Sequence, residues 1–309
     1  MRIIHLQTGR EREREKERER RREEEGHVHT DMLTYIVISP LLSLPTSLLP
    51  NADRAATASF DATARVWSLQ TFECLHVLQG HESWVRSICI HDGHVYTASG
   101  DHTARVWNMN TGTHENTYLG HTDWVRSVHV HRHDTSLAIT GSFDATVRVW
   151  PVRAGVCRKT VSFDSAVRCM CDNSKKLEVV VGCVSGAVSI ADISVGVVRI
   201  QLQPPQELPV NDVCTWAGNV LAATSAAEVR VWSCDGPLLG VFTQHPAFVS
   251  AVSAAPDGTC VSCDGDGCVF VWDASDRRVM VREDAPSRAL CCTAVGNDET
   301  TTLAFGLEE

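Results

Sequence analysis

One phrase of eleven residues occurs three times in this chain of 309 residues. It reads TASFDATARVW at 57–67, TASGDHTARVW at 97–107 and TGSFDATVRVW at 140–150. Related segments end at Trp232 and Trp272, with Ala191 at the matching place between, so that the segments recur at steps of 40 to 43 residues. A fixed period of this length indicates that the chain repeats one small unit that cannot bury its apolar face alone. The repeat therefore constrains the fold more than any other feature.

Each repeat contains four short runs with the alternation of β-strands, separated by turn residues. In the third full unit these runs are WVRSVHV (124–130), SLAITG (136–141), TVRVW (146–150) and CRKTVS (157–162). Four strands within one such period are the signature of a propeller blade, and no helical period of useful length competes with them. We therefore predict an all-β β-propeller over residues 31–309, preceded by a charged arm at 1–30.

Counting the units gives six blades from about Met32 to Met280. The segment 287–306 reads as the first two strands of a seventh blade, so we expect seven blades with the last incomplete. In the alternative, these two strands join 63–67 and 72–78 in a composite sixth blade. An open seventh blade would expose a strand edge.

The segments before the first repeat bear on the class of protein. Residues 10–25 carry eight basic and eight acidic side chains, and we interpret them as a solvated, mobile or weakly helical arm. The apolar stretch 33–50 contains prolines at 40, 45 and 50, which interrupt any helix that would span a membrane. No membrane association is therefore expected.

The net charge of −10 argues against binding to nucleic acid. The thirteen cysteines are scattered singly, which favours a reduced, intracellular setting and small buried side chains. Zinc ligation by Cys169/Cys171, Cys260/Cys263/Cys268 or Cys291/Cys292, or a metal site in HVHRH (129–133), is the less favoured interpretation. We expect no metal and no cofactor.

The repeats resemble the WD-repeat family, in which a Gly-His pair opens a unit and a Trp-Asp pair closes its third strand. Gly80-His81 and Gly120-His121 match the opening, and Trp272-Asp273 matches the closing pair. The resemblance implies a buried chain of hydrogen bonds through four side chains in each unit. The implied sets are His81, Thr97, Asp101, Trp107; His121, Thr140, Asp144, Trp150; His245, Ser262, Asp266, Trp272; and Thr57, Asp61, Trp67, with His29 as a further candidate.

The fourth and fifth units depart from this pattern. Ser185 and Ala226 stand where aspartate would, so we expect these blades to depend on the apolar packing of VVVGCV (179–184) and VLAAT (220–224). The sets themselves are structural rather than catalytic, because their histidines and acids are already used.

Arginine recurs near the start of the innermost strands, which face one rim of a propeller. We predict a basic arc with aromatic neighbours there, suited to an acidic or phosphorylated peptide. Its candidate residues are Phe60, Trp84, Arg86, Trp124, Arg126, Phe143, Arg168 and Arg288. The alternative is that W-V-R-S is a common sequence pattern of the family and that its arginines are only solvated.

The resemblance implies a non-enzymatic scaffold or adaptor that binds other proteins within a multiprotein complex, in the cytoplasm or alternatively the nucleus. The short hairpin ICIHDGHVYTAS (88–99) and the arginines also resemble F-box WD-repeat proteins, so a substrate-recognition subunit of a ubiquitin ligase is an alternative. Because the charged arm lacks an apolar face, we expect no F-box-like helical segment before the propeller. An enzyme is less favoured still, because the sequence has no nucleophile elbow, phosphate-binding loop or metal motif.

Overall fold

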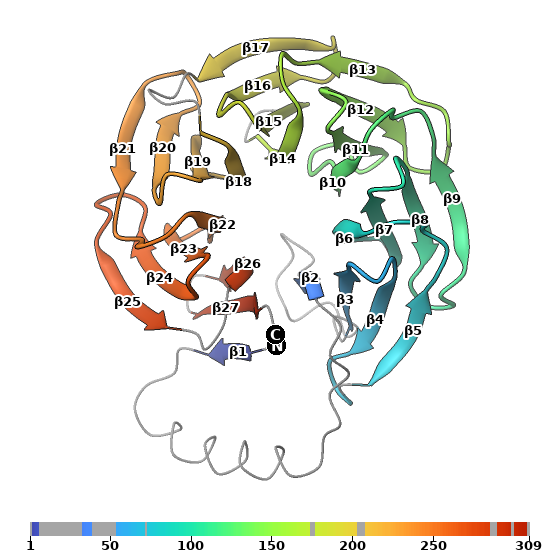
Figure 1. Ribbon diagram of the computed structural model, residues 1–309, viewed down its shortest axis with the longest axis horizontal. Helices are drawn as coiled ribbons and strands as arrows, with labels where there is room; N and C mark the ends of the chain where they lie inside the picture. Colours follow the sequence, from blue (N-terminus) through green and yellow to red (C-terminus); the bar gives the residue numbers. More distant parts are fainter. Residues whose placement is uncertain are drawn as a thin grey trace.

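The computed structural model shows a ring of β-sheets around a central axis (Figure 1). It describes residues 2–5, 33–38, 54–71, 73–173, 177–202, 208–284, 289–297 and 300–307. Throughout these residues every helix or strand assignment is a strand, in six four-stranded sheets and one three-stranded sheet. The predicted all-β propeller is therefore confirmed.

The strands of each four-stranded sheet pair in chain order, from the inner strand to the outer strand. The first two sheets contain β2 (Leu33–Ile38), β3 (Arg54–Ser59), β4 (Ala64–Ser68) and β5 (Cys74–Leu78), then β6 (Val85–His91), β7 (His94–Ser99), β8 (Ala104–Asn108) and β9 (His114–Tyr118). The third and fourth contain β10 (Val125–Val130), β11 (Leu137–Ser142), β12 (Thr146–Pro151) and β13 (Lys159–Ser162), then β14 (Val167–Asp172), β15 (Glu178–Cys183), β16 (Val188–Asp192) and β17 (Val197–Leu202). The fifth and sixth contain β18 (Val210–Trp216), β19 (Asn219–Thr224), β20 (Val229–Ser233) and β21 (Leu238–Phe242), then β22 (Val249–Ala254), β23 (Thr259–Asp264), β24 (Cys268–Asp273) and β25 (Val279–Asp284).

The seventh sheet joins the two ends of the described chain. Its order is β1 (Arg2–His5), β27 (Thr300–Leu307) and β26 (Ala289–Asn297), with β1 antiparallel to β27. The last two predicted strands thus lie in a seventh sheet, and β4 and β5 pair within the first sheet rather than in a composite blade. The third strand comes from residues 2–5, so the prediction that these residues belong to the charged arm is wrong. Pairing with β1 supplies hydrogen-bond partners for the backbone N–H and C=O groups at the edge of β27. The charged run 10–25 lies outside the described residues.

Every inner strand begins with a β-bulge. In β6 the register shifts between Val85 and Ser87, so that Arg86 is the extra residue, and Arg126 and Arg168 occupy the same place in β10 and β14. A bulge leaves its extra residue outside the ladder and redirects that side chain. In the five sheets from β6–β9 to β22–β25 the bulges therefore set the direction of one side chain per sheet at the same end of the ring.

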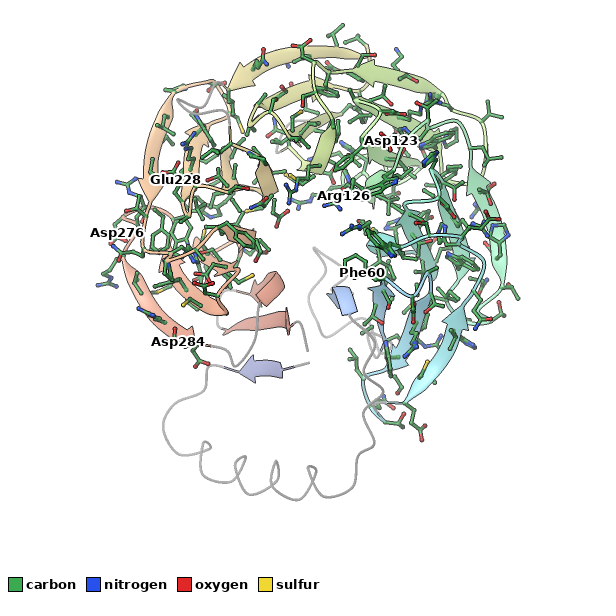
Figure 2. All side chains as sticks on the ribbon, viewed as in Figure 1. Phe60, Asp123, Arg126, Glu228, Asp276 and Asp284 are labelled. Carbon is green, nitrogen blue, oxygen red and sulfur yellow. The ribbon has the colours of Figure 1, made fainter. Side chains whose placement is uncertain are left out.

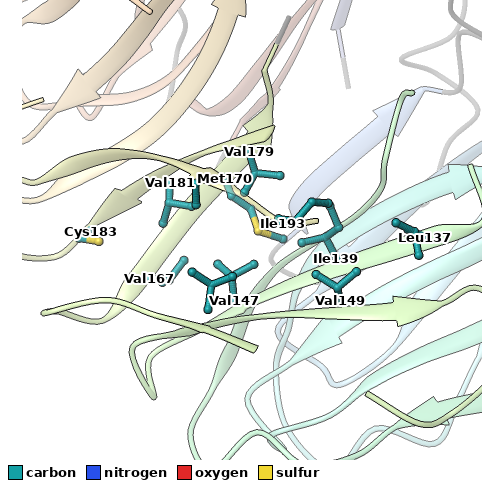
Figure 3. Packing of buried hydrophobic residues seen from close by; sticks show 12 residues of the cluster. Leu137, Ile139, Val147, Val149, Val167, Met170, Val179, Val181, Cys183 and Ile193 are labelled. Carbon is teal, nitrogen blue, oxygen red and sulfur yellow. The ribbon is translucent and has the colours of Figure 1, made fainter. Parts of the chain in front are cut away.

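The hydrophobic core lies between neighbouring sheets. Figure 3 shows the cluster between the third and fourth sheets, where Ile139 and Val149 pack with Met170, Val179 and Val181. All six residues of β15 are buried, as are the last five of β19, which confirms the apolar packing predicted for the fourth and fifth blades. Burying one such side chain stabilises the fold by about 1.5–3 kcal/mol, so stability is spread around the ring.

No helix with the length and apolar character needed to cross a membrane occurs among the described residues. The apolar stretch 33–50 contributes β2 at its start, and its residues 39–50 lie outside the described part of the chain.

Candidate functional site

Two of the predicted hydrogen-bond sets are present in the second and third sheets. Trp107 Nε1 donates to Thr97 Oγ1 at 2.9 Å, Thr97 Oγ1 lies 2.7 Å from His81 Nε2, and His81 Nδ1 lies 2.7 Å from Asp101 Oδ2. The third sheet repeats this with Trp150, Thr140, His121 and Asp144 at 2.8, 2.7 and 2.8 Å. Each set connects two strands, a turn and the loop before the inner strand, so both predictions are confirmed.

The donors and acceptors of these sets fix the charge of the histidines. The Thr97 hydroxyl accepts from the Trp107 indole and donates to His81 Nε2, which leaves Nδ1 as the N–H that donates to Asp101. Burial lowers the pKa of His81, although Asp101 acts in the opposite sense. Burial alone would raise the pKa of Asp101, but hydrogen bonds from His81, Thr103 and the backbone N–H of Glu82 hold it below its ordinary value. A neutral histidine beside a carboxylate is the consistent state.

In the sixth sheet the prediction that Asp266 bonds to His245 is wrong. His245 Nδ1 lies 2.9 Å from Asp264 Oδ2, and the other two members, Ser262 and Trp272, are placed as predicted. Asp264 is the last residue of β23, where β7 and β11 end in serine. Its other oxygen accepts from the backbone N–H groups of Asp266 and Cys268, so one buried carboxylate also holds the turn. Asp266 is exposed.

The first sheet holds part of its set. Trp67 Nε1 donates to Thr57 Oγ1 at 2.9 Å, and Asp61 accepts from Thr63 N and Oγ1. His29 lies outside the described residues. In the fourth and fifth sheets Val181 and Ala222 stand where the threonine would be, which follows from the strand registers.

Gly80 and Gly120 precede the two histidines for a steric reason. A Cβ on Gly80 would lie 2.6 Å from Arg105 Nη1, and one on Gly120 would lie 2.5 Å from Arg148 Nη1. Both glycines also have positive φ, at 150° and 136°. The Gly-His pair therefore lets an arginine of the third strand pass beneath the loop.

At the end of the ring where the inner strands begin, aromatic side chains of three sheets form a continuous row. The ring centroids of Phe60 and Trp84 are 5.2 Å apart, those of Trp84 and Trp124 5.9 Å, and those of Trp124 and Phe143 5.8 Å. The indoles are 45% and 37% exposed. We call these four residues the aromatic rim.

Backbone hydrogen bonds place these side chains. Gly100 N donates to Trp84 O, and Phe143 N donates to Trp124 O, which ties the loop before each inner strand to the turn after the second strand. Gly100 holds the place that Phe60 and Phe143 hold in their own sheets. A Cβ there would lie 2.8 Å from Ser83 Oγ and in ordinary contact with Trp124, 3.8 Å from its Cδ1.

Two of the predicted arginines stack on this rim. The Arg86 guanidinium carbon lies 4.5 Å from the Phe60 centroid and 4.8 Å from that of Trp84, and Arg126 lies 5.3 Å from that of Phe143. Figure 2 places Phe60 and Arg126 beside the central opening of the ring. Arg168, the bulge residue of β14, is half-buried. Two residues before it stands Ala166, at the place that Trp84 and Trp124 hold before Arg86 and Arg126. The structure thus brings together six of the eight predicted residues.

Arg288 lies outside the described residues. The bulge of β26 falls between Ala289 and Cys291, so that Leu290 rather than Arg288 is the register equivalent of Arg86. The spacing of the seventh unit had been placed two residues too early.

Sequence reasoning missed Phe248, which is 36% exposed and stands where Trp84 and Trp124 stand in their sheets. A Cβ on Gly265 would lie 2.3 Å from the Phe248 ring, so this ring covers the turn of the sixth sheet. The match of A-F-V (247–249) to S-W-V (83–85) was the available signal.

The other candidate clusters have structural partners. His129 Nε2 lies 2.9 Å from Asp172 Oδ1, which joins the inner strands of the third and fourth sheets. Burial raises the pKa of the Cys169, Cys171 and Cys260 thiols. These thiols therefore stay uncharged and pack as small apolar side chains. Across the described residues no group of three His, Cys, Asp or Glu side chains is arranged to hold a metal ion.

Comparison with known proteins gives both a family and relatives. The family model "WD domain, G-beta repeat" matches residues 72–108, 112–151 and 236–273. Each of these ranges contains one of the three hydrogen-bond sets that include a histidine. The "Target of rapamycin complex subunit LST8" of Bos taurus is 26% identical over 241 residues, covering 73% of this chain and 74% of the relative.

Two further relatives match shorter stretches. The "Target of rapamycin complex subunit wat1" of Schizosaccharomyces pombe is 25% identical over 187 residues, covering 54% of this chain and 55% of the relative. The "Autophagy-related protein 16" of Arabidopsis thaliana is 23% identical over 166 residues, covering 51% of this chain and 33% of the relative.

Proposed function

We propose that this chain, which folds as a β-propeller and matches the WD-repeat family model at three places, is a non-enzymatic scaffold that binds other proteins within a multiprotein complex. Relatives named as subunits of a target of rapamycin complex support a role as one subunit of a larger assembly. Components of such a complex are the first partners to test. The cytoplasm remains the predicted location.

The aromatic rim is the observation that carries this proposal. Two exposed indoles lie edge to face at one mouth of the ring, and their backbone is fixed by hydrogen bonds to the neighbouring turns. Tryptophan and arginine are the residues that most often dominate the binding energy of protein interfaces. Because the rim side chains stack on one another, a partner loses little affinity to the ordering of this surface.

The bulge arginines suggest the chemistry of the bound segment. Arg86, Arg126 and Arg168 follow one another on three neighbouring inner strands of a chain with a net charge of −10. Guanidinium groups bind carboxylate or phosphate through paired hydrogen bonds. We therefore propose that the rim takes an acidic or phosphorylated segment of a partner.

The hydrogen-bond sets support a non-enzymatic role. His81, His121 and His245 with their aspartates have the composition of proton-transfer pairs, but each histidine is bonded on both ring nitrogens. A group that is bonded in this way has no ring nitrogen left for a substrate.

Affinity purification with quantitative mass spectrometry tests the proposal. The full chain is compared with Trp84→Ala, Trp124→Ala and Arg126→Ala, and with the matched control Arg158→Ala, whose exposed side chain precedes β13. We expect each rim variant to lose one shared set of partners, and the control to retain it. Recovery of the chain without stable partners would contradict the scaffold role. Capture that tolerates every rim change would contradict only the proposed surface.

A further inference from the structure

A cleft of about 720 Å³ opens between the second and third sheets, at the end of the ring opposite the aromatic rim. The β6–β7 turn, the starts of β7 and β9 and the segment around the end of β12 form its walls. Val106, Pro151 and Val152 supply apolar surface, and Asp92, His94, Glu115 and Arg153 supply charged or polar groups. A volume of this size is typical of sites that bind small molecules or side chains.

The cleft is also lined by Tyr96, whose hydroxyl is unusual. The side chain is fully buried, and its hydroxyl has no hydrogen-bond partner among the described residues. Tyr118, packed in the same cluster, donates its hydroxyl to Val152 O at 2.9 Å. Nearly all buried hydroxyl groups find a partner, so that a fully buried one without a partner requires an explanation.

The fold itself does not require a hydroxyl at this position. The strand registers show which residues hold the same place in the other five four-stranded sheets. They are Ala56, Ile139, Val180, Leu221 and Val261, all of them apolar. Tyr96 therefore introduces a polar group into a layer that is otherwise packed with hydrocarbon.

The acidic wall of the cleft is held in place by neighbours. Glu115 Oε1 accepts from Asn108 Nδ2 at 2.9 Å, and Glu115 Oε2 lies 3.0 Å from His94 Nε2. His94 Nδ1 in turn lies 2.7 Å from Asp92 O. Burial raises the pKa of the Tyr96 hydroxyl, the nearby Cys89, Asp92 and Glu115 add to this in the same sense, and Arg153 acts in the opposite sense. The cleft thus holds two carboxylates, one guanidinium and the imidazole of His94, which faces one of the carboxylates.

We propose that this cleft binds a basic side chain, arginine or lysine, from a partner protein. The aliphatic stem packs on Val106 and Val152, and the cationic head donates hydrogen bonds to Asp92 and Glu115 and to the phenolic oxygen of Tyr96. This contact satisfies the hydroxyl that the isolated chain leaves without a partner. The site is separate from the aromatic rim and takes a ligand of opposite charge.

The first test measures stability. Tyr96→Phe removes a hydroxyl that has no partner, so the full chain should be as stable in urea as the wild type or more stable. The matched control Tyr118→Phe removes a hydroxyl that is bonded to Val152 O and should lower the midpoint of unfolding. Equal losses in both variants would show that the Tyr96 hydroxyl is satisfied within the chain, and would overturn the proposal.

The second test measures binding to a defined probe. N-acetyl-arginine amide is titrated into the full chain by NMR, beside N-acetyl-citrulline amide, which has the same shape without the charge, and N-acetyl-glutamate amide. We expect saturable shifts from the arginine probe alone, weakened about tenfold in Glu115→Gln and in Tyr96→Phe. Trp84→Ala should bind the probe normally, so that a failure here is distinguishable from a failure of the rim. Equal binding of citrulline, or preference for glutamate, would overturn the proposal.

Discussion

Asp264 accepts the Nδ1 proton of His245 from a position eight residues before Trp272, whereas Asp101 accepts that of His81 from six residues before Trp107. The same bond is thus made from the end of a strand in one sheet and from the following turn in another. In the sixth sheet the carboxylate is fully buried, and it also accepts from two backbone N–H groups.

This placement predicts unequal effects of two neighbouring aspartates. Asp264→Ala leaves the buried His245 N–H and two backbone N–H groups without an acceptor, and should lower the free energy of unfolding by about 1–3 kcal/mol. Asp266→Ala, at the exposed turn position, should change it by less than about 0.5 kcal/mol. Urea denaturation of both variants measures the difference. A larger loss from Asp266→Ala would show that Asp266, as the spacing of the repeat indicated, is the aspartate that bonds to His245.

The buried histidines predict a loss of stability in mild acid. Burial lowers the pKa of His81, His121 and His245 below the ordinary value of 6.5. Between the lowered pKa and 6.5 the unfolded chain binds more protons than the folded chain, so the free energy of unfolding falls as the pH drops below about 6.5. Each histidine contributes a slope of at most about 1.4 kcal/mol per pH unit.

Urea titrations at several pH values between neutral and mildly acidic conditions measure this slope. His245→Gln removes one titrating group and should flatten it while lowering stability at neutral pH. Stability that rises on acidification would mean that the histidines are already charged in the folded chain.

The loop glycines give a steric prediction. Gly80→Ala should destabilise the fold by more than Gly93→Ala, because a Cβ at 80 meets Arg105 Nη1 at 2.6 Å whereas a Cβ at 93 meets nothing within 4 Å. Gly93 has a φ of 71°, so Gly93→Ala measures the left-handed backbone cost of about 1–2 kcal/mol without the contact, whereas the φ of 150° at Gly80 disfavours alanine further. Thermal unfolding compares the pair, and similar losses would show that Arg105 moves aside freely.

Hydrogen exchange should differ around the ring. The fourth and fifth sheets lack the hydrogen-bond set, since Val181 and Ala222 replace its threonine, so amides of residues 166–232 should be less protected than those of 81–150. Exchange followed by mass spectrometry on the full chain measures this. Protection that is equal or greater in the fourth and fifth sheets would show that apolar packing outweighs the polar sets.

The period of the repeat predicted the six four-stranded sheets and their order, and carrying the WD-repeat resemblance over by that spacing implied two complete hydrogen-bond sets. It failed at Asp264 because spacing along the chain does not distinguish a carboxylate at the end of a strand from one in the next turn when both reach the same histidine. Repeat spacing also placed Arg288 where the bulge register gives Leu290. Both errors arise from one or two residues of local register, which only the pairing of strands determines.

The rim was predictable because tryptophan before an inner strand is conspicuous in the sequence. The stacking of Arg86 on Phe60 was not, because it depends on the β-bulge that redirects the arginine. Tyr96 gave no signal at all. Its significance lies in the lack of a hydrogen-bond partner, which no pattern of residue types reveals.

The contact between Trp84 and Trp124 also has an optical consequence. Two indole chromophores with centroids 5.9 Å apart and planes inclined at 64° couple their electronic transitions, and such coupling splits the ultraviolet circular dichroism into a pair of bands of opposite sign. A bound segment that moves either ring changes this coupling. The rim therefore contains its own spectroscopic reporter, which registers occupancy without any added label.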